Sequence, residues 1–237
     1  SEKELLEDLR RKAKEVKDRH EELLRDLERT LKKLKDEHDK KLKDLRDELR
    51  RVEKKLDDKE RTEALERVKE VLRKLLKLVE DLVRRNKEVI DKLLELVREL
   101  IERNKKVLEE LLKLVEDLSR KRSEDVERVI RELREILRKL HETNKRILDE
   151  LRRLLEELER ENRKILEEAK RLLEELEKKV DDKELLKEVK DLLRKLEKVV
   201  RDSLELLKRL LEDIEKRVRD SNRELKRILD DIEKKAK

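Results

Sequence analysis

Seven residue types are absent from this chain of 237 residues, namely Gly, Pro, Cys, Met, Trp, Tyr and Phe. Without cysteine there is no disulfide, no thiolate metal ligand and no cysteine nucleophile. Without glycine there is no phosphate-cradling loop and no dinucleotide-binding fingerprint. Without aromatic residues the chain offers no platform for stacking bases and no Trp or Tyr interface anchor. These absences exclude several common kinds of active site and binding site.

Charged residues make up 59% of the chain, and 73 positive residues against 67 negative ones give a net charge of +6. The excess is spread evenly along the sequence, whereas nucleic-acid binding needs a clustered positive patch. No stretch approaches 18 uncharged apolar residues, which a membrane-spanning helix would need. We therefore expect a protein that binds neither nucleic acid nor membrane.

Apolar residues recur at steps of three and four almost without interruption, which is the pattern of amphipathic helices. The pattern breaks at 57–62, 119–123 and 181–182, and Thr62, Ser123 and Asp182 are good N-cap residues there. Ser1 to Glu4 has the sequence of a capping box. The sequence predicts an all-α fold, an antiparallel up-down four-helix bundle formed by 1–237 as one domain, with helices at 2–57, 62–119, 124–180 and 183–235.

An eighteen-residue repeat runs through the predicted helices. Residues 75–92 and 93–110 are similar in sequence, and so are the segments that open at Asn144 and Asn162. Eighteen residues are five turns at about 3.6 residues per turn, so the repeat matches a straight helix rather than a supercoiled one. We expect long, nearly straight helices, each about 80 Å in length at about 1.5 Å per residue.

Eight polar residues replace aliphatic ones at the centres of the apolar stripes, two on each helix and eighteen apart. In an antiparallel bundle they fall into two layers, and they are His20, Asn104, Asn144 and Ser221 in the first and His38, Asn86, Asn162 and Ser203 in the second. A buried polar group without a partner costs about 1–3 kcal/mol. The eight residues are therefore expected to form hydrogen-bond networks that specify the helix register.

Three further polar residues lie at the edges of the stripes. His141 and Asn222 flank the first layer and are candidates to extend it. Thr30 lies at the edge of its stripe, as a network member or as an exposed residue.

The absent residue types, the tiled repeats and the paired polar layers resemble de novo designed helical bundles with buried hydrogen-bond networks, and the resemblance covers the whole chain. It implies a stable scaffold, sometimes an oligomer, a heterodimer module or a switch, and no catalysis. The lack of glycine in the turns departs from common designed loops, so the helix ends must use another geometry.

Other chemistries fit the sequence less well. A metal site would need four ligands, and no carboxylate occupies a stripe centre beside His20 or His38. Ser203 with His38 has the residue types of a nucleophile and base, but no carboxylate orients the histidine. Burial of neutral histidines could also make the bundle respond to pH. We expect no enzyme activity, no metal, no cofactor and no small-molecule substrate.

The sequence thus predicts a designed structural scaffold without natural biochemical activity, soluble and cytoplasmic in an expression host. The alternative is a designed interaction module, as a homo-oligomer, a heterodimer or a helix-exchange or pH-responsive switch. The monomer is favoured, while self-association or a partner helix stays open. The apolar edge residues that could face a second chain are Leu78, Leu96, Leu114 and Leu206.

Overall fold

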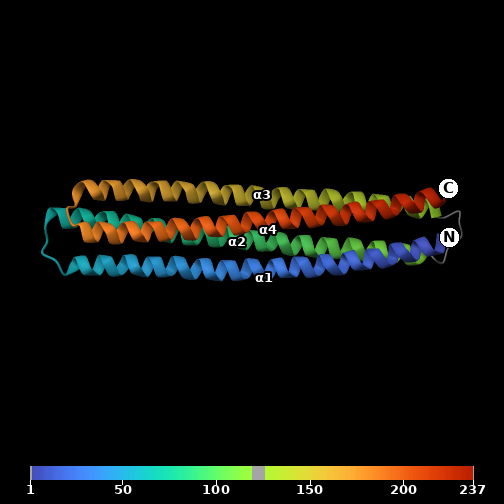
Figure 1. Cartoon of the computed structure of the whole chain (residues 1–237), viewed down its shortest axis with the longest axis horizontal. Helices are drawn as coiled ribbons and strands as arrows, with labels where there is room; N and C mark the ends of the chain where they lie inside the picture. Colours follow the sequence, from blue (N-terminus) through green and yellow to red (C-terminus); the bar gives the residue numbers. More distant parts are fainter. Residues whose placement is uncertain (1, 119–125, 237) are drawn as a thin grey trace. The chain divides into compact units, whose positions relative to one another are not determined.

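The computed structural model describes residues 2–118 and 126–236, which form four long helices. They are α1 (Glu2–Asp57), α2 (Glu63–Leu118), α3 (Val126–Lys179) and α4 (Lys183–Ala236). The described residues contain no strand. Successive helices run in opposite directions (Figure 1), so the predicted all-α four-helix bundle is confirmed.

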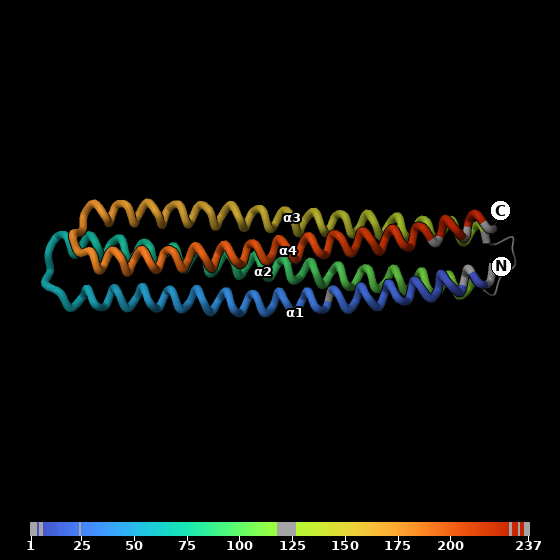
Figure 2. Tube along the Cα trace, in the orientation of Figure 1, coloured from blue at the N-terminus to red at the C-terminus, as the bar shows by residue number. Residues whose placement is uncertain are grey.

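The packing divides the chain into two units, each built from one segment of every helix. Unit 1 comprises 1–30, 93–152 and 209–237, and unit 2 comprises 31–92 and 153–208. Since each helix contributes to both, the units are not consecutive stretches of sequence, and the chain passes from one to the other four times. Figure 2 lets the reader follow each helix along the sequence by its colour.

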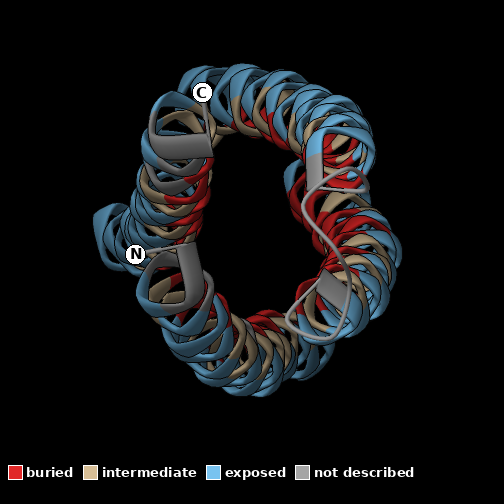
Figure 3. Cartoon of the chain, turned by 90° about the vertical axis from the view of Figure 1, so that its right-hand side faces the viewer, coloured by how far each residue is buried: buried red, intermediate tan, exposed pale blue. Residues whose placement is uncertain are grey.

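Side-chain contacts establish which helices are neighbours within each unit. In unit 1, Lys17 of α1 pairs with Glu109 of α2 at 3.4 Å. In unit 2, Lys195 of α4 pairs with Glu48 of α1 at 3.7 Å, and Lys170 of α3 pairs with Glu197 of α4 at 3.1 Å. The buried side of each helix faces the other three, and the exposed side carries the charged residues (Figure 3).

Aliphatic side chains fill both cores. In unit 2 the core draws on all four helices, with Leu42, Leu82, Leu176 and Val189 almost fully buried. The core of unit 1 is built in the same way around Leu9, Leu111, Leu133 and Leu225. Burial of a Leu or Val side chain stabilises a fold by about 1.5–3 kcal/mol.

Two of the predicted N-caps are confirmed. The Thr62 Oγ1 atom accepts a hydrogen bond from the backbone N–H of Leu65 at 3.2 Å, and Asp182 Oδ1 accepts one from Leu185 at 3.3 Å. Ser1 and Ser123 lie outside the described residues, as does the whole 119–123 turn.

Helix ends without glycine use ordinary backbone geometry. In the described part of the chain no residue has a positive φ, and α3 ends with a hydrogen bond from the Val180 N–H to the Leu176 carbonyl at 3.0 Å. The left-handed conformation that favours glycine is therefore not needed at the two described turns.

The apolar edge residues have different surroundings. Leu78 packs against the core of unit 2 and Leu114 against that of unit 1, both partly buried. Leu96 is half-buried as well, whereas Leu206 keeps 39% of its surface exposed. None of the helices, over the residues described, has a segment both long enough and apolar enough to cross a membrane.

Candidate functional site

Six of the eight stripe-centre polar residues are buried. His20, His38, Asn86, Asn104, Asn144 and Asn162 each keep 5% or less of their surface exposed. Ser203 and Ser221 are half-buried. The four residues of the first layer all lie in unit 1, and the four of the second layer all lie in unit 2.

In the second layer His38 links three helices. Asn86 Nδ2 of α2 lies 2.8 Å from His38 Nε2, and Ser203 Oγ of α4 lies 2.8 Å from His38 Nδ1. An amide nitrogen only donates, so Nε2 accepts and the ring proton resides on Nδ1, which donates to the serine hydroxyl. The histidine is neutral in this arrangement, because both ring nitrogens would carry protons in the charged form.

Asn162, the fourth residue of the second layer, is not joined to this chain of hydrogen bonds. Its Oδ1 atom is buried without a partner among the described residues, and so is Oδ1 of Asn86. The layer therefore connects α1, α2 and α4 through side-chain hydrogen bonds but does not engage α3.

In the first layer the four residues form two separate pairs. Asn104 of α2 and Asn144 of α3 face each other amide to amide, each donating from Nδ2 to the other's Oδ1 at 2.8 and 3.0 Å. Asn104 Nδ2 also donates to the carbonyl of Leu100 at 2.6 Å. Ser221 Oγ lies 3.4 Å from His20 Nδ1, and Nε2 of His20 is buried without a partner in the described part of the chain.

Both buried histidines are hard to protonate. Burial lowers the pKa of His20 from 6.5 to about 4. Burial likewise lowers the pKa of His38 to about 4, with Asp39 opposing the shift and Lys41 adding to it. The physical cause is desolvation, since a charged imidazolium loses its hydration inside the core.

The other polar candidates do not join the layers. His141 is exposed, and its Nδ1 lies 3.4 Å from Asn222 Nδ2, at the limit of a hydrogen bond. The Thr30 hydroxyl donates to the carbonyl of Asp26 at 2.8 Å, one turn back on its own helix. The contact between His141 and Asn222 joins α3 to α4 outside the two layers, and that of Thr30 stays within α1.

The burial of Lys69 was not predicted from the sequence. Lys69 keeps 7% of its surface exposed, and its Nζ lies 2.7 Å from Asp57 at the end of α1. The hydrogen bond from Lys69 lowers the pKa of the Asp57 carboxyl. A signal was available, because Lys69 stands four residues after Leu65 and three before Leu72, on the apolar stripe itself.

Metal-binding chemistry finds no support in the arrangement. In 2–118 and 126–236, no cluster of three or more His, Cys, Asp or Glu residues could hold a metal ion. The histidines are instead placed beside amide and hydroxyl groups, which suits neutral hydrogen bonding between helices.

The α3–α4 seam of unit 1 carries a second feature, which sequence reasoning also missed. A groove of about 740 Å³ opens between the two helices, bounded by Arg134 to Arg152 on α3 and by Glu215 to Leu229 on α4. We call it the α3–α4 groove. Its signal in the sequence is faint, because the residues that line it are the charged and aliphatic types found everywhere in the chain.

Comparison with known proteins gives no relative. No protein-family model, curated protein or solved structure matches the chain.

Proposed function

We propose that the chain is a designed structural scaffold without natural biochemical activity, in which the two buried polar layers specify the register of the helices. The observation that carries the proposal is the chain of hydrogen bonds from Asn86 through His38 to Ser203, which joins three helices at one level. The Asn104–Asn144 pair makes the same kind of link between α2 and α3.

The energetics support specification rather than stability. A satisfied hydrogen bond contributes a net of about 0.5–1.5 kcal/mol, whereas a buried leucine contributes about 1.5–3 kcal/mol over an exposed one. Leucine at the eight positions would therefore stabilise the bundle more. Because the sequence repeats every eighteen residues, an all-leucine stripe would also let one helix shift by a whole repeat and still match apolar to apolar.

The test compares full and partial replacement of the layers. Replacing all eight residues with Leu is expected to raise the denaturation midpoint and to broaden the distribution of oligomers seen by native mass spectrometry. Asn144→Leu alone leaves Oδ1 of Asn104 without its donor in the core and should lower stability by about 1–3 kcal/mol. If the eight-leucine variant stays a single species of unchanged mass and structure, packing and turns alone fix the register and the proposal fails.

A second candidate is an interaction module, and the α3–α4 groove of unit 1 is the observation that favours it. We favour a monomer as the form of the free chain, whether it is a scaffold or an interaction module. An interaction module would bind its partner as that monomer. Light scattering tests this point, because a mass near 29.1 kDa supports the monomer and a multiple of it contradicts it.

A further inference from the structure

The α3–α4 groove is closed at its ends and open in its middle. At one end Arg134 Nη2 pairs with Asp230 at 2.8 Å and also with Glu233, and at the other Arg152 Nη2 pairs with Glu215 at 2.5 Å. Between these ends, the two helices share the weak contact from Asn222 to His141. The groove lies between these two ends and is lined by residues of both helices.

In unit 2 the ion pairs between the same two helices are spread along the seam. Three ion pairs cross their seam there, Lys190–Glu177 at 2.6 Å, Lys208–Glu159 at 3.0 Å and Lys170–Glu197 at 3.1 Å. Unit 1 also has three ion pairs across this seam, but they all lie at the ends of the groove. The two units therefore differ in where these ion pairs lie along the seam and not in how many there are.

The floor of the groove is apolar. Val218 and Leu229 of α4 are buried, and Leu137 and Leu148 of α3 are partly buried beside them. Asn144 also reaches the floor, but both polar atoms of its amide are bonded to Asn104. With its polar group satisfied, the floor suits aliphatic side chains better than a hydrogen-bonding ligand.

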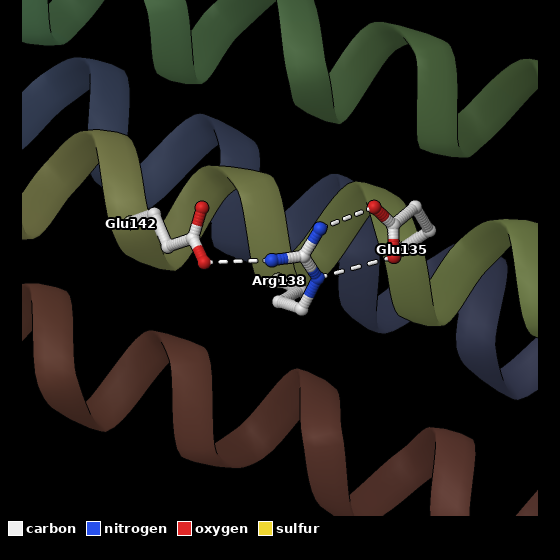
Figure 4. Close-up of polar contacts among 3 residues, drawn as sticks. All are labelled: Glu135, Arg138 and Glu142. Atoms are coloured by element: carbon white, nitrogen blue, oxygen red, sulfur yellow. Dashed lines mark hydrogen bonds and ion pairs between the residues drawn. The ribbon is translucent and has the colours of Figure 1, made fainter.

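Some of the cations at the rim are already neutralised. Arg138 donates from Nε and Nη2 to Glu135 at 3.1 and 2.5 Å and from Nη1 to Glu142 at 2.7 Å, all on α3 (Figure 4). The hydrogen bond to Glu135 raises the pKa of Arg138, and the same bond lowers the pKa of Glu135. Arg134 and Arg152 are paired as described above.

Four other cations at the rim have no such partner. No carboxylate of the described residues lies within ion-pair distance of Lys145, Arg219, Arg223 or Lys226, and all four are exposed. The opposing charges in the same lining are Asp149 and Glu215, and Glu215 is paired with Arg152. The groove therefore presents an apolar floor beneath a rim on which positive side chains outnumber negative ones.

We infer that the α3–α4 groove of unit 1 docks an amphipathic helix of a partner protein, with aliphatic residues facing the floor and acidic residues facing the rim. This inference rests on the second candidate function and is independent of the register role of the polar layers. Insertion of an apolar helix face into a groove between helices is a common mode of recognition. The α3 side of the groove spans eighteen residue steps, which is about 27 Å at about 1.5 Å per residue.

A second copy of the chain fits the rim poorly. Counting Lys, Arg, Asp and Glu within their bounds, none of the four helices carries a net negative charge, and α4 has a positive excess. The complementary partner is consequently a different, acidic helix.

The experiment uses the full chain and a synthetic eighteen-residue helical peptide with leucine on one face and glutamate elsewhere, labelled for fluorescence anisotropy. The control peptide has lysine in place of every glutamate. We expect the acidic peptide to bind, the basic one not to bind, and the affinity to fall as salt is added, because exposed charges are screened.

Two variants of equal charge locate the site. The groove variant combines Lys145→Glu, Arg219→Glu, Arg223→Glu and Lys226→Glu and should bind the acidic peptide at least tenfold more weakly. The matched variant changes four exposed cations of α1 and α2 in unit 1, Lys14→Glu, Arg25→Glu, Lys105→Glu and Lys113→Glu. It should bind as the parent does.

A third variant does not depend on charge. Asn222→Trp fills the middle of the groove and should also abolish binding of the acidic peptide. If circular dichroism shows that the groove variant is unfolded, Asn222→Trp alone tests whether the peptide binds in the groove.

Equal binding of the two peptides, or equal loss in the groove and matched variants, overturns the inference. The inference is also overturned if the parent chain is a dimer and Asn222→Trp makes it a monomer. In that case a second copy of the chain, and not an acidic helix, occupies the groove. Peptide binding is measured separately from register, so either proposal can fail without the other.

Discussion

The charge state of His38 follows from the two atoms it faces. Its Nε2 accepts from the Asn86 amide, so a second ring proton would point at an N–H group and would also lack hydration. Lys41 adds to the cost of that proton, and Asp39 reduces it. Since His20 is similarly buried, both histidines oppose protonation in the folded state.

Stability should therefore fall at mildly acidic pH. The folded pKa of each histidine, about 4, lies below the ordinary histidine pKa of 6.5, so the unfolded chain binds protons first as the pH drops. The contribution is fully present above pH 6.5 and is lost as the pH falls toward about 4, at no more than about 1.4 kcal/mol per pH unit for each histidine. Urea denaturation between pH 7 and pH 5 measures it.

Exposed His141 provides the control for that measurement. Replacing His20 and His38 with Asn should flatten the dependence of unfolding free energy on pH, whereas His141→Asn should leave it unchanged. A double variant with the parent's pH dependence would mean that carboxylates, and not the buried histidines, are responsible.

The positions of the polar residues could be predicted from the sequence, but their pairing could not. The apolar stripe alone places Asn86 and Asn162 at the interior, and both are buried. Whether an amide finds a partner depends on side-chain torsions and on shifts of a fraction of a turn between helices. Asn86 reaches His38 through Nδ2, while Asn162, an equivalent residue by spacing, is joined to no other residue of its layer. The Oδ1 atoms of both are unpaired among the described residues.

At the scale of the element, helix starts depend on a single side chain each. Thr62 satisfies one of the amides that α2 leaves open in its first turn, and Asp182 does the same for α4. The hydrogen bond from the Leu185 N–H, followed by that from Lys59, lowers the pKa of Asp182. Lys59 lies in the turn after α1, so the α1–α2 and α3–α4 turns of unit 2 are linked at 3.3 Å.

Thr62→Ala should lower the free energy of unfolding by about 1 kcal/mol, because the Leu65 amide loses its acceptor. Thr62→Ser keeps the hydroxyl and should restore most of that loss. Guanidinium denaturation monitored by circular dichroism makes the comparison. Equal stability of the Ala and Ser variants would show that solvent already satisfies the amide and that the cap contributes nothing.

Helix bounds were accessible to sequence reasoning because cap residues and interrupted periodicity coincide. The predicted start of the fourth helix at 183 and end of the first at 57 agree with α4 and α1. The α3–α4 groove was not accessible, since it depends on how far two helices separate, and residues such as Leu148 and Val218 fit the apolar pattern whether the seam is open or closed.

At the scale of the whole molecule, the two units should differ in their local stability along α3 and α4. In unit 2 three ion pairs are spread along the α3–α4 seam. In unit 1 the three ion pairs of this seam lie at the ends of the groove, and its middle has the weak Asn222–His141 contact. Local opening requires less energy where fewer contacts must break. Amide hydrogen exchange should therefore be faster in 137–148 and 218–226 than in 158–172 and 192–204.

The α1 and α2 segments of unit 1 serve as the control, because they show whether fast exchange is confined to the groove or extends over the whole unit. There α1 and α2 are joined by Arg98–Glu28 at 2.7 Å and Lys17–Glu109 at 3.4 Å, so residues 13–27 and 97–111 should exchange slowly. Bound acidic peptide should slow exchange along the groove and leave these segments unchanged. Equally fast exchange in all four helix segments of unit 1 would instead indicate that the unit opens as a whole, and the groove would then not be a preformed surface.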